Sequence, residues 1–233
     1  MAGKWGIKLK TKTVVLVIMD GVGIGTGGEG DAVKRAYTPM LDMLIASCPH
    51  TALKAHGTAV GLPSDDDMGN SEVGHNALGC GQIYSQGAKL VNESIENSAI
   101  FHSETWKELI SGCAENESKL HFIGLLSDGN VHSNIEHLKS MLEKAKQDGV
   151  KNARVHILLD GRDVPATSAL LYVDELETCL SNLNDAGFNA KIASGGGRMK
   201  ITMDRYQADW DMVKTRWETH VCGIGRQFPT ARE

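Results

Sequence analysis

The chain has 233 residues, 41% of them hydrophobic, enough for one large domain or two modest ones. Its formal net charge of −5 excludes an overall positive field for a nucleic-acid backbone, so we expect no nucleic-acid partner. The apolar run at residues 14–19 is too short for a membrane span or a cleaved signal peptide, so we expect no membrane partner. Five cysteines without paired spacing favour reduced thiols and a cytoplasmic location.

The first third of the chain predicts separate elements joined by glycine-rich loops. Residues 14–19 are continuously apolar and β-branched, which predicts a strand buried on both faces. Thr38 and Pro39 are typical of an N-cap and first helical position, and they open a helix over residues 40–46. Residues 51–58 predict a second strand, and a helix is expected to begin at Ser71.

The second half has a more regular pattern. Strands are predicted at residues 120–126, 153–159 and 190–193. Between them lie two segments with apolar residues at helical spacing, ended by Gly149 and Gly187. This alternation predicts an α/β fold with a parallel sheet and right-handed crossovers.

Polar loops follow all three of these predicted strands, at residues 127–132, 160–163 and 195–198. Ligands of open parallel sheets bind at the carboxyl ends of the strands, so these loops should form one site. They carry the candidate binding residues His132, Arg162, Asp163 and Arg198, and Arg205 follows closely. Converging guanidinium groups suit a phosphate or a carboxylate.

Two more candidates lie in the first half. Asp20 ends the predicted buried strand, where a carboxylate either binds a metal or caps the glycine loop through backbone amides. Ser71 lies at a predicted helix start. Its simplest role is that of an N-cap, but the same position directs backbone N–H groups towards a phosphate carried by the serine.

The run Asp-Met-Gly-Asn-Ser-Glu-Val-Gly-His at residues 67–75 is the most specific motif of the chain. Together with residues 15–21, 127–132 and 160–163, in this order, it resembles the successive signatures of cofactor-independent phosphoglycerate mutases. The segment at residues 195–205 is most similar to the trypanosomatid and plant branch of that family. The resemblance covers the N-terminal part of the family chain.

This resemblance implies a metal-dependent isomerase of glycolysis and gluconeogenesis that interconverts 3-phosphoglycerate and 2-phosphoglycerate through a phosphoserine. Residues 1–88 would be the N-terminal piece of an alkaline-phosphatase-like metal domain, and residues 89–233 an incomplete phosphotransferase domain. Two divalent ions (Mn²⁺, Mg²⁺ or Co²⁺) would be used and no 2,3-bisphosphoglycerate. Asp20 and Ser71 match metal ligands, and Ser71 also matches the phosphorylated serine.

The substrate-binding positions of the family match His132, Arg162, Asp163, Arg198 and Arg205, with Asp128 a weaker assignment. Arg205 is less secure, because the chain between it and Arg198 is longer than the common bacterial pattern. The family chain is much longer and carries its remaining metal ligands in a later segment. We therefore expect this chain to be a fragment, a monomer, and inactive by itself.

Two alternatives remain open at this point. The glycines at residues 23–28 formally satisfy the dinucleotide fingerprint of an oxidoreductase, although no helix is predicted to begin directly after them. Asp128 and His132 could instead belong to a non-catalytic metal-binding module if they shared a helical face, which Gly129 between them disfavours.

Overall fold

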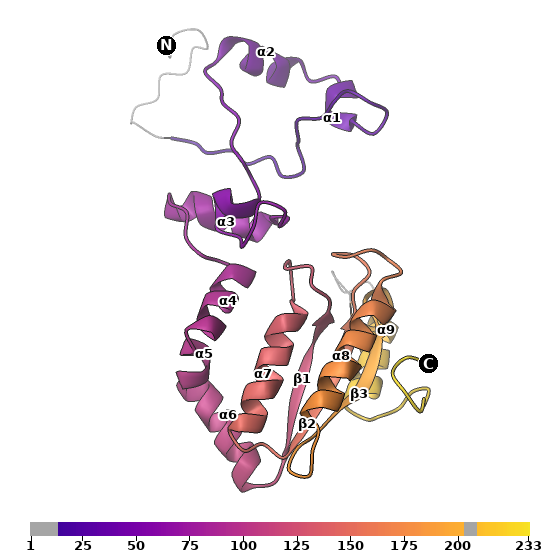
Figure 1. The fold of residues 1–233 in the computed structure, drawn as a ribbon. Coiled ribbons are helices and arrows are strands. Elements are labelled where there is room, and N and C mark those ends of the chain that lie inside the picture. The colour runs from indigo at the N-terminus through magenta and orange to yellow at the C-terminus, as the bar shows by residue number, and fades with distance from the viewer. Residues whose placement is uncertain (1–13, 203–208) are drawn as a thin grey trace. The chain divides into compact units, whose positions relative to one another are not determined.

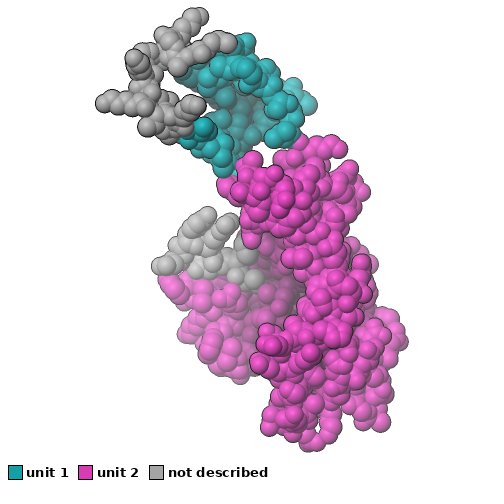
Figure 2. All heavy atoms as spheres, turned by 90° about the vertical axis from the view of Figure 1, so that its left-hand side faces the viewer, with its two compact units in different colours: residues 1–53 teal, residues 54–233 magenta. Residues whose placement is uncertain are grey.

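A computed structural model of the protein describes residues 14–202 and 209–233 (Figure 1). The chain divides into two compact units, Met1–Leu53 and Lys54–Glu233 (Figure 2). The second unit contains the whole sheet. The predicted domain boundary between residues 88 and 89 concerns the longer protein and stays a prediction.

The first unit contains two short helices, α1 (Ala32–Arg35) and α2 (Pro39–Ser47). Helix α2 confirms the predicted helix after Thr38 and Pro39. The Thr38 hydroxyl does not cap a backbone N–H group but donates to the Asp42 carboxylate at 3.3 Å. Pro39 at the first helical position is therefore the more direct start signal.

The strands predicted at residues 14–19 and 51–58 are wrong. Residues 14–19 are irregular and exposed, and Val14 reaches 90% exposure. Residues 51–55 are also irregular, and the 3₁₀ helix η1 (Gly57–Val60) follows them. A strand needs neighbouring strands to hydrogen-bond its backbone and to cover its side chains. The described part of the first unit contains no strand that could pair with either segment.

The second unit begins with the segment at residues 57–87, which we call the Ser71 segment. It contains η1 and α3 (Ser71–Cys80), packed around a small core of Val60, Leu62 and Val73. The buried Gln86 side chain donates to the backbone carbonyls of Val60 at 2.7 Å and Val73 at 3.2 Å, and so joins η1 to α3. This core is separate from the main core of the unit.

Three helices that the sequence analysis did not assign lead to the sheet: α4 (Ala88–Glu96), α5 (Ala99–His102) and α6 (Glu104–Glu115). Helix α6 inserts Trp106 and Ile110 into the main core. The Trp106 indole N–H donates at 3.0 Å to Asp148, which directly follows a later helix, α7 (Ile135–Gln147). The side chain of Ser103 caps α6 by accepting from the Trp106 backbone N–H.

The predicted parallel sheet is confirmed. Its strands are β1 (Lys119–Leu126), β2 (Asn152–Leu159) and β3 (Asn189–Gly197), in the order β1-β2-β3, with Leu120 opposite Ala153 and Ala153 opposite Ala190. The connections contain α7 (Ile135–Gln147) and α8 (Ala169–Leu183), as the helical spacing predicted. Both helices lie over the same face of the sheet (Figure 1). Leu142 of α7 and Leu176 of α8 are fully buried against that face.

The other face of the sheet carries the π-helix η2 (Arg198–Thr202) and α9 (Trp210–His220). Here His156 of β2 hydrogen-bonds Ser194 of β3 at 2.6 Å, and Ser194 hydrogen-bonds His220 of α9 at 2.7 Å. His121 of β1 extends this chain to His156 at 2.9 Å. Among the described helices, none is long and apolar enough to cross a membrane.

Candidate functional site

The three polar loops at the carboxyl ends of the strands do converge. Asp160 follows β2, and Arg198 follows β3 directly. One guanidinium nitrogen of Arg198, Nη1, lies 2.8 Å from Asp160 Oδ1 and 2.8 Å from Asp163 Oδ2. The same Asp163 oxygen lies 2.7 Å from Nδ1 of His132, in the loop after β1. We call these four residues the charged cluster.

Burial increases towards the base of the charged cluster. The side chains of Arg198 and Asp160 are each 2% exposed, whereas Asp163 is 10% and His132 is 52% exposed. The buried Arg198–Asp160 ion pair therefore lies beneath the more accessible side chains of Asp163 and His132. A ligand from solvent would meet His132 first, with Asp163 behind it.

Asp160 is ionised in the fold. Burial by itself would raise the pKa of this carboxyl. The hydrogen bonds from the Ser127 hydroxyl, from two backbone N–H groups and from Arg198 outweigh burial and hold the pKa below its ordinary value of 3.8. Ser127 donates at 2.6 Å, and the backbone N–H groups of Arg162 and Asp163 donate at 3.2 and 3.1 Å. Asp160 thus joins all three loops.

Arg198 is charged as well. Burial works against its charge, but the hydrogen bonds to Asp163 and Asp160 raise the pKa of Arg198 above its ordinary value. Its Nε atom is buried and has no hydrogen-bond partner among the described residues. In this structure Arg198 is bound to two carboxylates and holds Asp163 beside Asp160.

The hydrogen bond to Asp163 selects the tautomer of His132. A carboxylate only accepts, so in the 2.7 Å contact Nδ1 of His132 carries the proton and donates it to Asp163. Arg198 Nη2 lies 3.4 Å from the same Nδ1 and also only donates, so this longer contact is not a hydrogen bond in that tautomer. In this tautomer Nε2 is the acceptor of the ring whenever the ring carries a single proton. Because His132 is half-exposed, Nε2 can accept a hydrogen bond from a hydroxyl group of a ligand.

Close packing holds the loop after β1 against the charged cluster. A Cβ atom on Gly129 would lie only 3.1 Å from Cβ of Asp163, so a larger residue would require the neighbouring loop to shift by a few tenths of an ångström. The neighbouring Asp128 accepts a 2.5 Å hydrogen bond from the hydroxyl of Tyr172 on α8. Burial and the nearby Asp128 carboxylate raise the pKa of Tyr172 to about 12, so the phenol remains the donor.

The two remaining candidate arginines are Arg162 and Arg205, and the structure describes only Arg162. Arg162 adjoins Asp163 and is exposed, and its guanidinium forms no hydrogen bond or ion pair within the described ranges 14–202 and 209–233. It is available to an anion at the rim of the charged cluster. Arg205 lies outside the described residues.

Ser71 is exposed and is the first residue of α3. It is not the N-cap, which corrects the simplest sequence interpretation: Asn70 is the cap, and its side chain accepts from the Val73 N–H at 2.9 Å. Nδ1 of His75 donates to the Ser71 backbone carbonyl at 2.7 Å, since a carbonyl only accepts. Nδ1 therefore carries a proton and cannot take one from the Ser71 hydroxyl 3.2 Å away.

A complete metal site is not present in the described residues. Asp20 is an exposed residue in a turn of the first unit, and Ser71 belongs to the second unit. Across residues 14–202 and 209–233, no group of three or more His, Cys, Asp or Glu side chains is placed to hold a metal ion.

The structure disfavours both alternative interpretations. In the described residues no strand precedes the glycines at 23–28, and the four-residue α1 begins only at Ala32. The N–H of Gly27 donates to Asp31 at 2.8 Å instead of facing a pyrophosphate. Asp128 and His132 share no helical face, because α7 begins at Ile135.

Sequence reasoning did not identify three residues that organise this region: Ser127, Asp160 and Asn130. The sequence shows Asp160 and Ser127 only as members of polar loops. Their position directly after buried strands was a usable signal, because a buried polar group needs partners. Asn130 has a positive φ of 57°, which the sequence alone does not disclose.

These observations define the class of protein: an α/β protein with a parallel sheet and a polar site at the carboxyl ends of its strands. The sequence model of the family described as "BPG-independent PGAM N-terminus" matches residues 91–233. This chain belongs to that family.

Curated relatives support the assignment. A "probable 2,3-bisphosphoglycerate-independent phosphoglycerate mutase" of Leptospira interrogans is 54% identical over 204 residues, which are 88% of this chain and 37% of the relative. The 2,3-bisphosphoglycerate-independent phosphoglycerate mutase of Trypanosoma brucei brucei is 51% identical over 206 residues, again 88% of this chain and 37% of the relative. The chain thus spans less than half the length of these relatives.

A solved structure has the same fold. It is a crystal structure of Leishmania mexicana phosphoglycerate mutase at low cobalt concentration. The similarity has a TM-score of 0.81 and 50% sequence identity, and covers 92% of this chain and 39% of that one.

Proposed function

We propose that the protein containing this chain interconverts 3-phosphoglycerate and 2-phosphoglycerate without 2,3-bisphosphoglycerate, through a phosphoserine at Ser71. The observation that carries the proposal is the charged cluster, where His132, Asp163 and Arg198 meet at the carboxyl ends of parallel strands. The names of the relatives, 51–54% identical, supply the reaction.

The substrate has an anionic phosphate, a carboxylate and a hydroxyl group. Arg162 is exposed and can grip an anion in bidentate fashion. Nε2 of His132 can accept from the glycerate hydroxyl, and Asp163 keeps the ring in the required tautomer. Asp163 is also the nearest candidate for a general base. Arg198 and Arg205 complete the proposed binding set.

Ser71 would carry the phosphoryl group between the two positions of the glycerate. It lies at the first turn of the ten-residue helix α3, where the positive end of the helix dipole favours an anion. Because Asn70 performs the capping, the Ser71 hydroxyl is not required for the helix start. His75 is not its general base in this structure, so activation must come from another group.

The proposed function also includes metal dependence. The similar Leishmania mexicana structure is one at low cobalt concentration. When bound, divalent ions would lower the pKa of a serine hydroxyl and neutralise phosphoryl charge. Asp20 and Ser71 are the proposed ligands from this chain. Further ligands would have to come from outside the described residues, and we propose no step that depends on the ions.

The remaining finer assignments are proposals of the same kind. Residues 1–88 would belong to an alkaline-phosphatase-like domain and residues 89–233 to a phosphotransferase domain, and the family match begins close to that boundary, at residue 91. All five cysteines are free thiols in the structure, which agrees with a reducing, cytoplasmic compartment. A monomer is proposed.

The experiment is the substitution Ser71→Ala in a protein of the relatives' full length that contains this chain. We expect loss of mutase activity and of the phosphorylated serine peptide in mass spectrometry, with an unchanged circular dichroism spectrum. Ser111→Ala is the matched control, because Ser111 is an exposed helical serine in α6. Substantial turnover by the Ser71→Ala protein would contradict the proposal.

A further inference from the structure

A direct hydrogen bond joins the Ser71 segment to the loop that carries His132. The side-chain amide of Asn130 donates to Asp67 Oδ1 at 2.7 Å, across 63 positions of the sequence. Asp67 lies four residues before Ser71, and Asn130 lies two residues before His132. We infer that the Asp67–Asn130 pair positions the proposed phosphoryl carrier relative to the charged cluster.

Both partners are held in place by further bonds. The other carboxylate oxygen of Asp67, Oδ2, accepts from the Ser64 backbone N–H at 2.7 Å and from its hydroxyl at 2.8 Å. The carbonyl oxygen of the Asn130 side chain accepts from Asn134 at 2.6 Å, and Asn134 caps α7. The connection therefore runs from the Ser71 segment to the N-terminus of a core helix.

The backbone of Asn130 gives independent support. Its φ of 57° lies in the left-handed region, where glycine is the least strained residue and asparagine is among the few others tolerated. Asn130 thus keeps a side chain at a position where glycine would fit more easily. The use of that side chain in two short hydrogen bonds, to Asp67 and Asn134, explains its presence.

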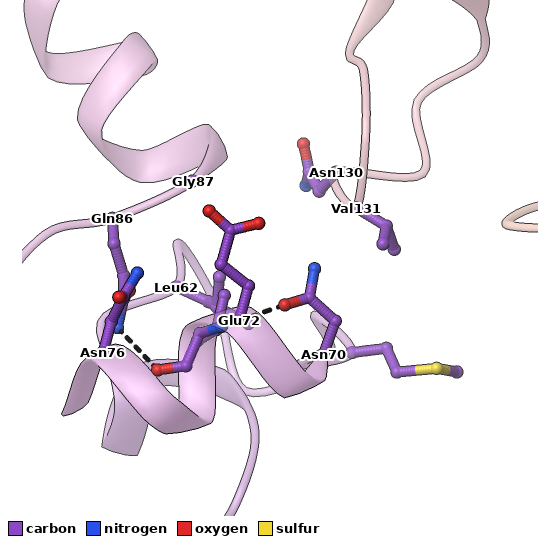
Figure 3. A pocket seen from close by; sticks show the side chains of 10 residues that line it. Leu62, Asn70, Glu72, Asn76, Gln86, Gly87, Asn130 and Val131 are labelled. Atoms are coloured by element: carbon purple, nitrogen blue, oxygen red, sulfur yellow. Dashed lines mark hydrogen bonds between the residues drawn. The ribbon is translucent and has the colours of Figure 1, made fainter. Parts of the chain in front are cut away.

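The Ser71 segment and the loop after β1 do not share one core of buried apolar side chains. A cavity of about 120 Å³ lies beside the pair, lined by residues of α3 and by Asn130 and Val131. Glu72 extends into the space between α3 and this loop (Figure 3). The core of the Ser71 segment is also small and separate from the main core. A polar contact across a hollow interface can therefore determine where α3 lies.

The inference rests on the proposed function of Ser71, so its test separates position from activity. Asn130→Gly removes the amide and relieves the backbone, which excludes loop strain as the cause of any effect. Asn130→Asp sets two carboxylates against each other. Adding Asp67→Asn reverses the pair: the amide introduced at position 67 would donate to the carboxylate introduced at position 130, while its oxygen still accepts from Ser64. Glu117→Gly is the matched control, since Glu117 also has a positive φ, of 51°, and its ion pair with Lys151 is exposed.

Hydrogen exchange measured by mass spectrometry on the 233-residue chain reports position. We expect residues 57–80 to exchange about tenfold faster in Asn130→Gly and Asn130→Asp, as for loss of one hydrogen bond to a charged group. The Asp67→Asn/Asn130→Asp double variant should recover, and Glu117→Gly should leave this segment unchanged. Unchanged exchange in both Asn130 variants would overturn the inference.

Kinetics on the full-length protein then test the consequence. We expect kcat to fall about tenfold in Asn130→Gly with KM little changed, because the substrate site stays intact while the carrier is displaced. The double variant should recover kcat. Faster exchange with unchanged kcat would overturn the positioning role. Full activity of Ser71→Ala would instead refute the proposed function. The hydrogen-exchange result would still stand in that case, because it does not depend on the role of Ser71.

Discussion

The buried ion pair of Arg198 gives the sharpest test of the structure. Arg198→Met keeps an unbranched, apolar stem of similar reach but removes the cation between Asp160 and Asp163. Asp160 is 2% exposed, so its carboxylate would remain buried without its ionic partner. Removing one partner of a buried pair costs roughly 3–5 kcal/mol in the free energy of unfolding.

The remaining hydrogen bonds of Asp160 place the expected loss of stability in Arg198→Met near the lower end of this range. Asp160 keeps three donors in the variant: the Ser127 hydroxyl and the backbone N–H groups of Arg162 and Asp163. These bonds stabilise the remaining charge. We therefore expect a loss of about 3 kcal/mol, measured by urea unfolding of the 233-residue chain and followed by far-UV circular dichroism.

A matched control comes from the same chain. Arg232 pairs with Asp174, and both side chains are at least half exposed. Arg232→Met should leave the unfolding midpoint almost unchanged, because water screens that pair. If Arg198→Met were as stable as Arg232→Met, the reasoning about the buried pair would be refuted.

The pH dependence of unfolding gives a second test of the role of Arg198. The pKa of Asp160 is lowered in the fold, so its stabilisation is present above the ordinary pKa of 3.8 and is lost as pH falls below it. The variant raises the folded pKa of Asp160, and the difference between wild type and variant should shrink on acidification. A difference that grew as pH fell would contradict this assignment.

Two further predictions concern the rest of the second unit. Burial, the largest cause, lowers the pKa of both His156 and His220 below the ordinary 6.5, so the unfolded chain binds more protons and stability should decline as pH falls from about 6.5. Urea titrations across pH should show a smaller decline in His156→Gln than in the wild type, and an equal decline would contradict this assignment. Leu176 is fully buried, whereas Leu171 is 65% exposed. Leu176→Ala should therefore lower the free energy of unfolding by about 2–5 kcal/mol. Equal unfolding midpoints for Leu176→Ala and Leu171→Ala would show that this core is misassigned.

The sequence by itself predicted the sheet unit well. The apolar spacing in α7 and α8 and the apolar runs of the three strands predicted each element and their parallel order. Such patterns are local consequences of burying one face of a helix or both faces of a strand, so they can be read along the chain. The specific run around Ser71 led to the family, which the comparisons confirmed.

The sequence did not predict the cap of α3 or the helices α4, α5 and α6 correctly. Asn70, not Ser71, caps α3, because two adjacent residues were both good caps and only the backbone geometry chooses between them. Helices α4 and α5 have only nine and four residues and are separated by two, which hides them in the sequence, whereas the twelve-residue α6 was missed despite its length. The Ser103 cap and the spacing of Trp106 and Ile110 were signals that could have located α6.

Only the tertiary structure decided how the site is built. Residues 14–19 have the composition of a buried strand, but a strand forms only where partner strands exist, and none is described in that unit. The sequence predicts Arg198 as a ligand-binding residue, but it does not show that the guanidinium is buried against Asp160 and Asp163. The Asn130–Asp67 bond joins residues 63 positions apart. Burial and pairing of charges depend on neighbours that are distant in sequence, so they are properties of the folded chain.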